Sequence, residues 1–208
     1  MNLAAPRSLL LLTLSCCWFA QPVESPAADA SKPVLLYSRY FNAAGEARYL
    51  PDGTFKDVLT RLREHFVVRV NSLPLTQENL SGVGVVLIAN PSDKAVGTNR
   101  PPPHISARDI DALTRFVEAG GGLIVMGNQE NHNLEVEDVN KLLSRFGLVF
   151  TNLYTDAKKL VLPLETPILG GLRWAYYTGN LVEITPAHPA KPLINEAKVT
   201  APSPWRWK

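Results

Sequence analysis

Cysteine is nearly absent from this chain of 208 residues, and both of its cysteines lie close to the start. Cys16 and Cys17 fall within an apolar segment, and no cysteine follows them. A chain cut beyond this segment would hold no disulfide, no thiolate ligand for a metal and no cysteine nucleophile. Its stability must then come from an ordinary hydrophobic core, which suits a composition with 46% apolar residues.

The chain also lacks a surplus of charge of either sign. It has 21 lysine and arginine residues against 19 aspartate and glutamate residues, a formal net charge of +2. Binding to nucleic acid would need basic side chains gathered on one face. Arg61, Arg63 and Arg69 are instead spread among acidic neighbours. We therefore expect no nucleic acid partner.

No hydrophobic run is long enough for a membrane helix, which needs about 20 apolar residues. Residues 9–20 are mostly apolar and follow a single basic residue, Arg7. This arrangement is typical of a secretory signal peptide. We predict a signal peptide and disordered leader over residues 1–30, with cleavage after Ala20 or Ala30. The protein is accordingly expected to be secreted or periplasmic.

A lipid anchor on Cys16 or Cys17 is the alternative fate of the same segment. Leu14 and Ser15 precede the two cysteines in an order close to that of a bacterial lipoprotein signal. The match is incomplete, because a cysteine stands where a small residue is expected. We expect contact with a membrane only if one of these cysteines carries a lipid.

Short apolar runs alternate with helical patterns from residue 33 to residue 150. Runs of apolar, often β-branched residues predict buried parallel strands, and apolar residues at helical spacing predict helices with one buried face. Strands are expected at residues 33–37, 67–70, 84–89, 122–126 and from 148, with helices within 54–66, 106–119 and 136–146. The predicted fold class is α/β, a mostly parallel sheet with helices on both faces.

The pattern changes in the last quarter of the chain. Short strands separated by proline and glycine are expected at residues 159–162, 173–177 and 181–184. We therefore predict an α/β domain over residues 31–172 and a short β-rich C-terminal extension and tail over residues 173–208. The chain could also be the N-terminal part of a longer architecture.

Two of the predicted helices carry signals for their ends. Thr54 with Asp57, and Ser106 with Asp109, have the spacing of a capping box. The glycines at residues 120–122 end the second helix, and Gly120 and Gly121 are expected to supply its left-handed C-cap. They do not form a phosphate-binding loop, since such a loop leaves a strand and opens a helix. No cofactor is predicted.

The segments ISARDIDALTRFVEAGGGLIVMGNQ and VNKLLSRFGLVF give the chain a family resemblance. Residues 33–172 resemble the class I glutamine amidotransferase-like superfamily, and most closely its cysteine-less branches, such as trehalose-utilisation-like proteins and uncharacterised envelope domains. The resemblance implies a flavodoxin-like sheet, whose usual strand order is 2-1-3-4-5.

The catalytic pair of that superfamily is missing from this sequence. The superfamily places a nucleophilic cysteine in the turn that here reads Gly127-Asn128-Gln129, and a late histidine followed two residues on by glutamate. Here the late histidine is His188, and Ala190 stands in the position of the glutamate. Glutamine hydrolysis through a thiol and an imidazole is therefore not expected, and the resemblance implies a pseudo-enzyme.

Polar residues follow the predicted central strands. Ligands of open α/β sheets bind at the carboxyl ends of the strands. The candidate ligand-binding residues for a small polar ligand are Arg39, Asn90, Asp93, Asn128 and Gln129.

Glu130 and His132 come just after the same strand end as Asn128. They could act as acid and base, but a solvated polar loop is the simpler interpretation. Two ligands do not make a metal site, so no metal is predicted. His104 follows three prolines and is expected to shield the start of a helix.

Two functions remain open at this point. The first is a secreted or periplasmic, non-catalytic binding or scaffolding domain that recognises a small polar ligand or an envelope protein partner. The alternative is a carbohydrate-directed hydrolase that uses Glu130 and His132. The sequence favours the first, because no convincing set of catalytic residues is present.

Overall fold

The computed structural model describes residues 32–128, 133–155, 158–161, 164–165, 168–171, 173–176, 179–186 and 188–193. The predicted signal peptide, leader and lipid anchor fall on residues 1–30 and lie outside the described residues, as does the end of the tail. Among the helices of the described part, none has both the length and the apolar character that crossing a membrane requires.

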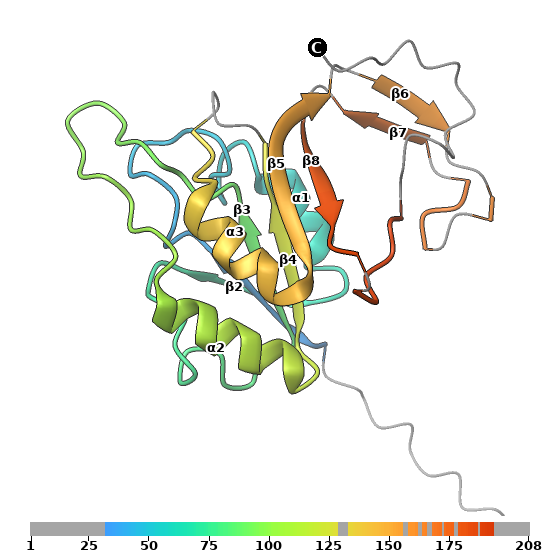
Figure 1. The fold of residues 1–208 in the computed structure, drawn as a ribbon. Helices are drawn as coiled ribbons and strands as arrows, with labels where there is room; N and C mark the ends of the chain where they lie inside the picture. Colours follow the sequence, from blue (N-terminus) through green and yellow to red (C-terminus); the bar gives the residue numbers. More distant parts are fainter. Residues whose placement is uncertain are drawn as a thin grey trace, which may run out of the picture. The chain divides into compact units, whose positions relative to one another are not determined.

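Four parallel strands form the central sheet, in the order β2-β1-β3-β4 (Figure 1). The two inner strands, β1 and β3, read VLLYS and VVLIA and are almost fully buried. An apolar run of this kind fits only a strand that is covered on both faces. The bounds of the four strands are β1 Val34–Ser38, β2 Val67–Asn71, β3 Val85–Ala89 and β4 Gly122–Met126.

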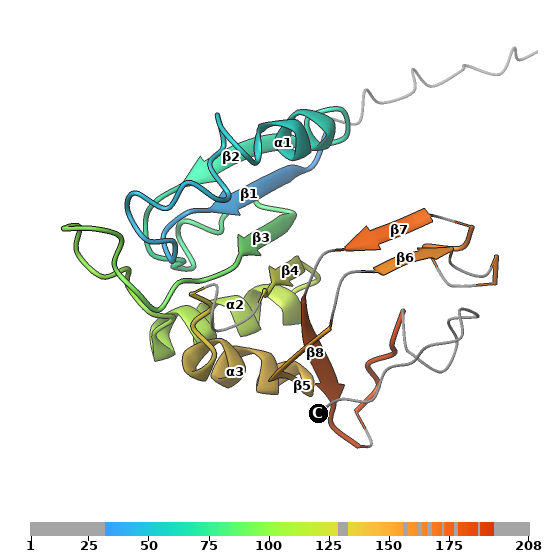
Figure 2. The same ribbon diagram turned by 90° about the horizontal axis from the view of Figure 1, so that it is seen from above.

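Side chains that alternate along β1 enter two separate cores. Leu35 and Tyr37 pack with Phe55 and Leu59, on the side of helix α1 (Lys56–Leu62). Leu36 enters the other core, which also contains the apolar faces of α2 (Ala107–Glu118) and α3 (Glu137–Leu143). Figure 2 shows α1 on one side of the sheet and α2 and α3 on the other. The two-residue period of a strand thus divides one apolar run between two layers.

Helix α2 begins and ends as its sequence predicts. The hydroxyl of Ser106 accepts a hydrogen bond from the backbone N–H of Asp109 at 3.2 Å, and the carboxylate of Asp109 accepts one from the N–H of Ser106 at 3.0 Å. At the other end, Gly120 has a φ of 97°, which confirms the left-handed C-cap. A side chain on Gly121 would collide with the ring of Phe116.

The capping box predicted for the first helix is wrong. Helix α1 begins at Lys56 with Phe55 at the N-cap, and no side chain caps it. The hydroxyl of Thr54 instead donates a hydrogen bond to the carbonyl of Ala47 at 2.8 Å. The hydroxyl that was expected to cap the helix is therefore used in a hydrogen bond within the preceding loop.

The fifth predicted strand does not extend the parallel sheet. After a short 3-10 turn (Ser144–Phe146), the chain bends at Gly147, whose φ is 67°, and enters β5 (Leu148–Thr155). Strand β5 pairs antiparallel with β8 (Gly179–Ile184). The sheet thus has the first four positions of the usual order 2-1-3-4-5, and the fifth strand pairs with β8 instead.

A second antiparallel pair joins β6 (Lys158–Val161) to β7 (Arg173–Tyr176). The parallel sheet between helices, with short antiparallel strands after it, confirms the predicted α/β fold class. The pairs β5–β8 and β6–β7 each join a strand before residue 172 to a strand after it. The domain boundaries at residues 30 and 172 stay predictions.

The buried side of α2 gives a direct test of this packing. Leu113 is fully buried, so Leu113→Ala should lower the free energy of unfolding by about 2–5 kcal/mol. Leu73 is 59% exposed, and Leu73→Ala should change it by no more than about 0.5 kcal/mol. Urea denaturation of both variants measures the difference. Equal losses would contradict the assignment of Leu113 to the core.

Candidate functional site

The carboxyl edge of the parallel sheet brings two of the predicted site residues together. Asn90 comes directly after β3, and one residue, Gly127, separates Asn128 from the end of β4. The side-chain oxygen of Asn90 accepts a hydrogen bond from the backbone N–H of Asn128 at 2.8 Å, and the N–H of Asn90 donates to the carbonyl of Met126 at 2.8 Å. Asn90 is buried and has a φ of 45°, a conformation that asparagine tolerates better than most residues.

The loop after β1 folds over this edge. The side-chain amide of Asn42 donates to the carbonyls of Ala89 and Asn90 at 2.8 and 3.0 Å. The hydroxyl of Ser92 accepts from the N–H of Ala43 at 3.3 Å. The strand ends are therefore closed by contacts with the protein's own loop.

Arg39, another of the predicted ligand-binding residues, is engaged by the same loop. Its guanidinium donates to the carbonyl of Tyr49 at 2.7 Å, and the hydroxyl of Tyr37 donates to the same carbonyl at 2.6 Å. Burial raises the pKa of Tyr37 to about 12, against an opposing effect of Arg39. Burial also raises the pKa of Tyr49, and a hydrogen bond with the side chain of Asn128 offsets part of that rise. Both phenols thus stay neutral at physiological pH.

A charged pair stiffens the loop next to Tyr49. Arg48 donates to both carboxylate oxygens of Glu46, at 2.9 and 2.8 Å, and its backbone N–H donates to one of them at 3.0 Å. Glu46 is 7% exposed. The hydrogen bonds from Arg48 are the main reason that the pKa of Glu46 lies below its usual value.

The remaining predicted residues lie elsewhere or outside the described residues. The backbone N–H of Asp93 donates to the carbonyl of Asn133 at 3.1 Å, and Lys94 lies 3.7 Å from its carboxylate. Gln129, Glu130 and His132 lie outside the described residues. The ligand-binding role of this set stays a prediction.

Several buried side-chain oxygens at the end of β1 and in the loops after these strands have no hydrogen-bond partner among the described residues. The atoms are Ser38 Oγ, Asn42 Oδ1, Asp93 Oδ1 and Asn128 Oδ1. A buried polar atom without a partner is costly, so the edge retains unused capacity to accept hydrogen bonds.

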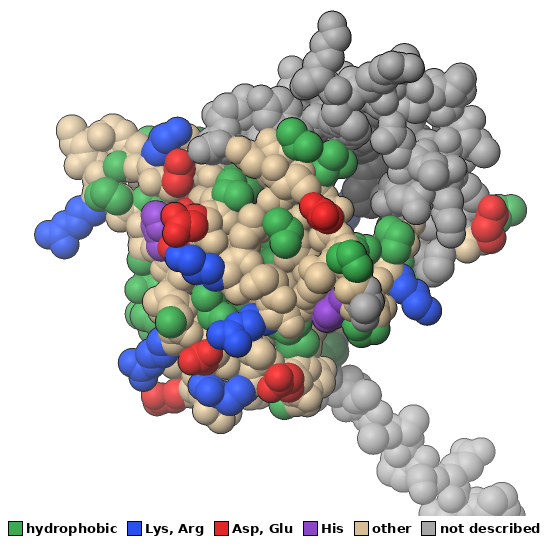
Figure 3. All heavy atoms as spheres, in the orientation of Figure 1, with side chains coloured by type: hydrophobic (Ala, Val, Ile, Leu, Met, Phe, Trp, Pro, Cys, Tyr) green, Lys and Arg blue, Asp and Glu red, His purple; other side chains and the backbone are tan. Residues whose placement is uncertain are grey.

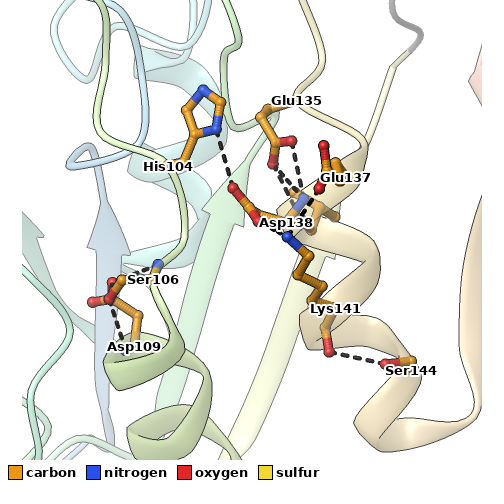
Figure 4. A network of polar contacts seen from close by, with 9 residues as sticks. His104, Ser106, Asp109, Glu135, Glu137, Asp138, Lys141 and Ser144 are labelled. Atoms are coloured by element: carbon orange, nitrogen blue, oxygen red, sulfur yellow. Dashed lines mark hydrogen bonds and ion pairs between the residues drawn. The ribbon is translucent and has the colours of Figure 1, made fainter.

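A second polar cluster lies at the start of α3 (Figure 4). Nδ1 of His104 is 3.1 Å from the carboxylate of Asp138, and the ammonium of Lys141 contacts Asp138 at 2.7 Å and Glu137 at 3.0 Å. The carboxylate of Glu135 accepts hydrogen bonds from the N–H groups of Asp138 and Val139. Glu135 therefore caps α3 with its side chain.

The charged groups of this cluster shift one another's pKa toward the ionised forms. The hydrogen bond from Lys141 is the largest cause that holds the pKa of Asp138 below its usual value, and His104 contributes as well. Asp138 and Glu137 in turn raise the pKa of Lys141. One ligand atom each from His104, Glu135 and Asp138 lies within 4.8 Å of the others, so these residues could hold a metal ion.

The sequence holds no local signal for this cluster. His104 and Asp138 are 34 residues apart and come from two different elements. Their separation in the chain has no metal-binding periodicity, and only the packing of α2 beside α3 brings them together. His104 was expected only to shield a helix start.

Fold and edge together define an α/β domain with a parallel sheet whose strand ends are covered by its own loop. A model of the IFT52 GIFT domain family matches residues 39–171, more than half of the chain. The chain therefore belongs to the IFT52 GIFT domain family.

Individual relatives agree with this assignment. The intraflagellar transport protein 52 homologues of Mus musculus and Homo sapiens are 23% and 22% identical over 112 residues, 54% of this chain. The chain spans about a quarter of the length of these relatives, 24% and 23% respectively. A solved structure, the mmIFT52 N-terminal domain, has the same fold with a TM-score of 0.56 and 16% identity, covering 74% of this chain and 69% of the other.

These findings correct the predicted family. The resemblance to class I glutamine amidotransferase-like and trehalose-utilisation-like proteins is wrong, because the matching family is that of the IFT52 GIFT domain. The residues that suggested it form the α2 cap, the glycine turn, β4 and α3. They satisfy the general packing needs of a parallel sheet, which unrelated α/β families share.

The predicted function and location are wrong for the same reason. Neither an amidotransferase-like envelope module nor a carbohydrate-directed hydrolase using Glu130 and His132 fits a family of intraflagellar transport proteins. The predicted secreted or periplasmic location is likewise contradicted, because the named relatives are intraflagellar transport proteins.

Removing the Asn90 side chain should open the sheet edge. Asn90→Gly keeps the backbone conformation accessible but leaves the N–H of Asn128 without its acceptor, which should cost about 1–3 kcal/mol of unfolding free energy. Asn133 also has a positive φ, of 61°, and no described side-chain hydrogen bond, so Asn133→Gly is the matched control and should be nearly neutral. Thermal denaturation of both variants measures the difference. Equal stability of the two variants would refute a stabilising role of the hydrogen bond between Asn90 and Asn128.

The Glu46–Arg48 pair should give a pH-dependent contribution to stability. The folded-state pKa of Glu46 is below its unfolded value of 4.5, so the contribution is complete above that pH and is lost as the pH falls through the folded value. The difference between wild type and Glu46→Gln should be about 1 kcal/mol at neutral pH and vanish in acid.

Denaturation across the acid range measures this difference. Exposed Glu78 has no described ion pair, and Glu78→Gln should show no such dependence. A difference that is constant with pH would mean that the pair has no charge-dependent role.

Proposed function

We propose that this chain is an intraflagellar transport protein whose GIFT domain binds protein partners. The match of the IFT52 GIFT domain model to residues 39–171 carries the proposal. Its named relatives are intraflagellar transport proteins, which supports a protein-binding role in the same process. The partner is then a transport protein and not the envelope protein expected from the sequence.

The geometry of the sheet edge supports a protein partner. Arg39 and Asn90, which could have contacted a small polar ligand, are engaged by main-chain groups of the same domain. A small ligand would have to replace those contacts. A protein can bind an exposed surface without opening them.

Strand β4 offers one such surface. Ile124 and Met126 are 47% and 41% exposed, and their register with Leu87 and Ala89 places both on the face that carries α1. Neighbouring exposed apolar side chains on one face are a common feature of protein interfaces. We name the pair Ile124 and Met126 the β4 patch, and an apolar segment of a transport protein would fit it.

Imaging in flagellated cells tests the proposal. The full chain, fused to a fluorescent protein, should enter the flagellum and move along it together with resident intraflagellar transport proteins. A fusion that stays in the cell body, without directed movement and without cross-linking to a transport protein, would refute the proposal.

The β4 patch is tested by charged substitutions in the same fusion. The double variant Ile124→Glu, Met126→Glu should lose directed movement, because two buried charges are costly in an apolar interface. Leu73→Glu, at an exposed apolar residue elsewhere, is the matched control and should move normally. Circular dichroism must show that both variants are folded.

A further inference from the structure

Three metal-ligating side chains from two elements converge at the start of α3. His104 belongs to the loop before α2, Glu135 lies just before α3, and Asp138 lies in its first turn. A ligand atom from each lies within 4.8 Å of the other two, and Figure 4 shows the three side chains facing one another. Histidine, acidic and basic side chains meet on the molecular surface over this part of α3 (Figure 3).

Glu135 adds a buried carboxylate to the two other ligands. It is only 4% exposed, and no ion pair of its carboxylate occurs among the described residues. The two backbone N–H groups that it accepts satisfy part of its hydrogen-bonding capacity, but they carry no full positive charge. Buried charges in proteins are usually paired or bound to a metal. A cation beside Glu135 would add a full positive charge to the partial one that the start of α3 supplies.

The charge balance of the cluster favours the same conclusion. Glu135, Glu137 and Asp138 bring three carboxylates, and Lys141 is the cation in contact with two of them. His104 adds an imidazole, which binds a divalent metal when it is neutral. Carboxylate oxygen and imidazole nitrogen together suit zinc and its neighbours among the transition metals better than calcium or magnesium.

The position of His104 is restricted by its neighbours. Prolines occupy residues 101–103, which limits the backbone before His104, and the capping box of α2 begins two residues later at Ser106. Its imidazole is 48% exposed, so it has room to turn toward a metal. Zinc bonds of 2.0–2.2 Å put ligand atoms about 3.3 Å apart, so modest side-chain rotations would close the site.

We propose that His104, Glu135 and Asp138 form a binding site for a divalent transition metal of the zinc type, with water completing the coordination. The ion would join the loop before α2 to the first turn of α3. It would also compete with Lys141 for the carboxylate of Asp138. This site does not depend on the proposed transport function.

Zinc titration of the full chain, freed of metal by a chelator, tests the proposal. Calorimetry should show one saturable site, and zinc at a hundred times its dissociation constant should raise the melting temperature by about 5–10 °C. Cobalt in place of zinc should give visible absorption that reports nitrogen and oxygen ligands. The absence of a saturable site would overturn the proposal.

Three variants locate the site. His104→Gln keeps a side chain that can hydrogen-bond to Asp138 but removes the imidazole, and it should weaken zinc binding at least about tenfold. Asp138→Asn should do the same. His65→Ala removes an exposed histidine that makes no described side-chain contact and should leave the affinity unchanged. If His65→Ala weakens binding as much as His104→Gln, the zinc is bound elsewhere and the proposal fails.

Lys141→Ala separates a metal site from a purely structural hydrogen-bond network. Removing the competing ammonium should tighten zinc binding about fivefold, since a unit charge at about 4 Å in water is worth about 1 kcal/mol. A network without a metal predicts only lower stability of this variant and no effect of zinc. An affinity that falls in Lys141→Ala would contradict the proposed competition.

Discussion

Burial of β1 and β3 on both faces is the constraint on which the rest of this structure depends. Their side chains alternate between two cores, so Leu35 and Tyr37 require α1 while Leu36 requires α2 and α3. Because the strands are parallel, each connection must pass over a face of the sheet, and the carboxyl ends of all four strands lie at one edge. The layers, the helix positions and the location of the polar edge all follow from this arrangement.

The loop after β1 provides hydrogen-bond partners for the polar groups at this edge of the sheet. Strand ends leave backbone carbonyls and N–H groups near a buried interior, where each must find a partner. Asn42 and Asn90 supply those partners, and Arg39 fixes the loop through the carbonyl of Tyr49. Side chains that the sequence suggested as ligand contacts thus serve first to close the fold.

Local patterns in the sequence were sufficient for much of the fold. The capping box of Ser106 and Asp109, the glycine turn after α2 and the apolar runs of the central strands each depend on residues within a few positions of one another. Thr54 shows the limit of such patterns, because a contact with Ala47 replaced the cap. The family assignment failed in a related way, since a good pattern for a parallel sheet identifies a fold and not a lineage.

The sequence by itself determined the α/β class, the layers of helices and the edge at which Asn90 and Asn128 meet, because these follow from periodicity and from the direction of parallel strands. Only the tertiary structure decided that β5 pairs with β8, and that His104 meets Asp138 across 34 residues. Such contacts join segments far apart in the chain. Their partners are selected by the packing of whole elements, and no spacing within the sequence encodes that choice.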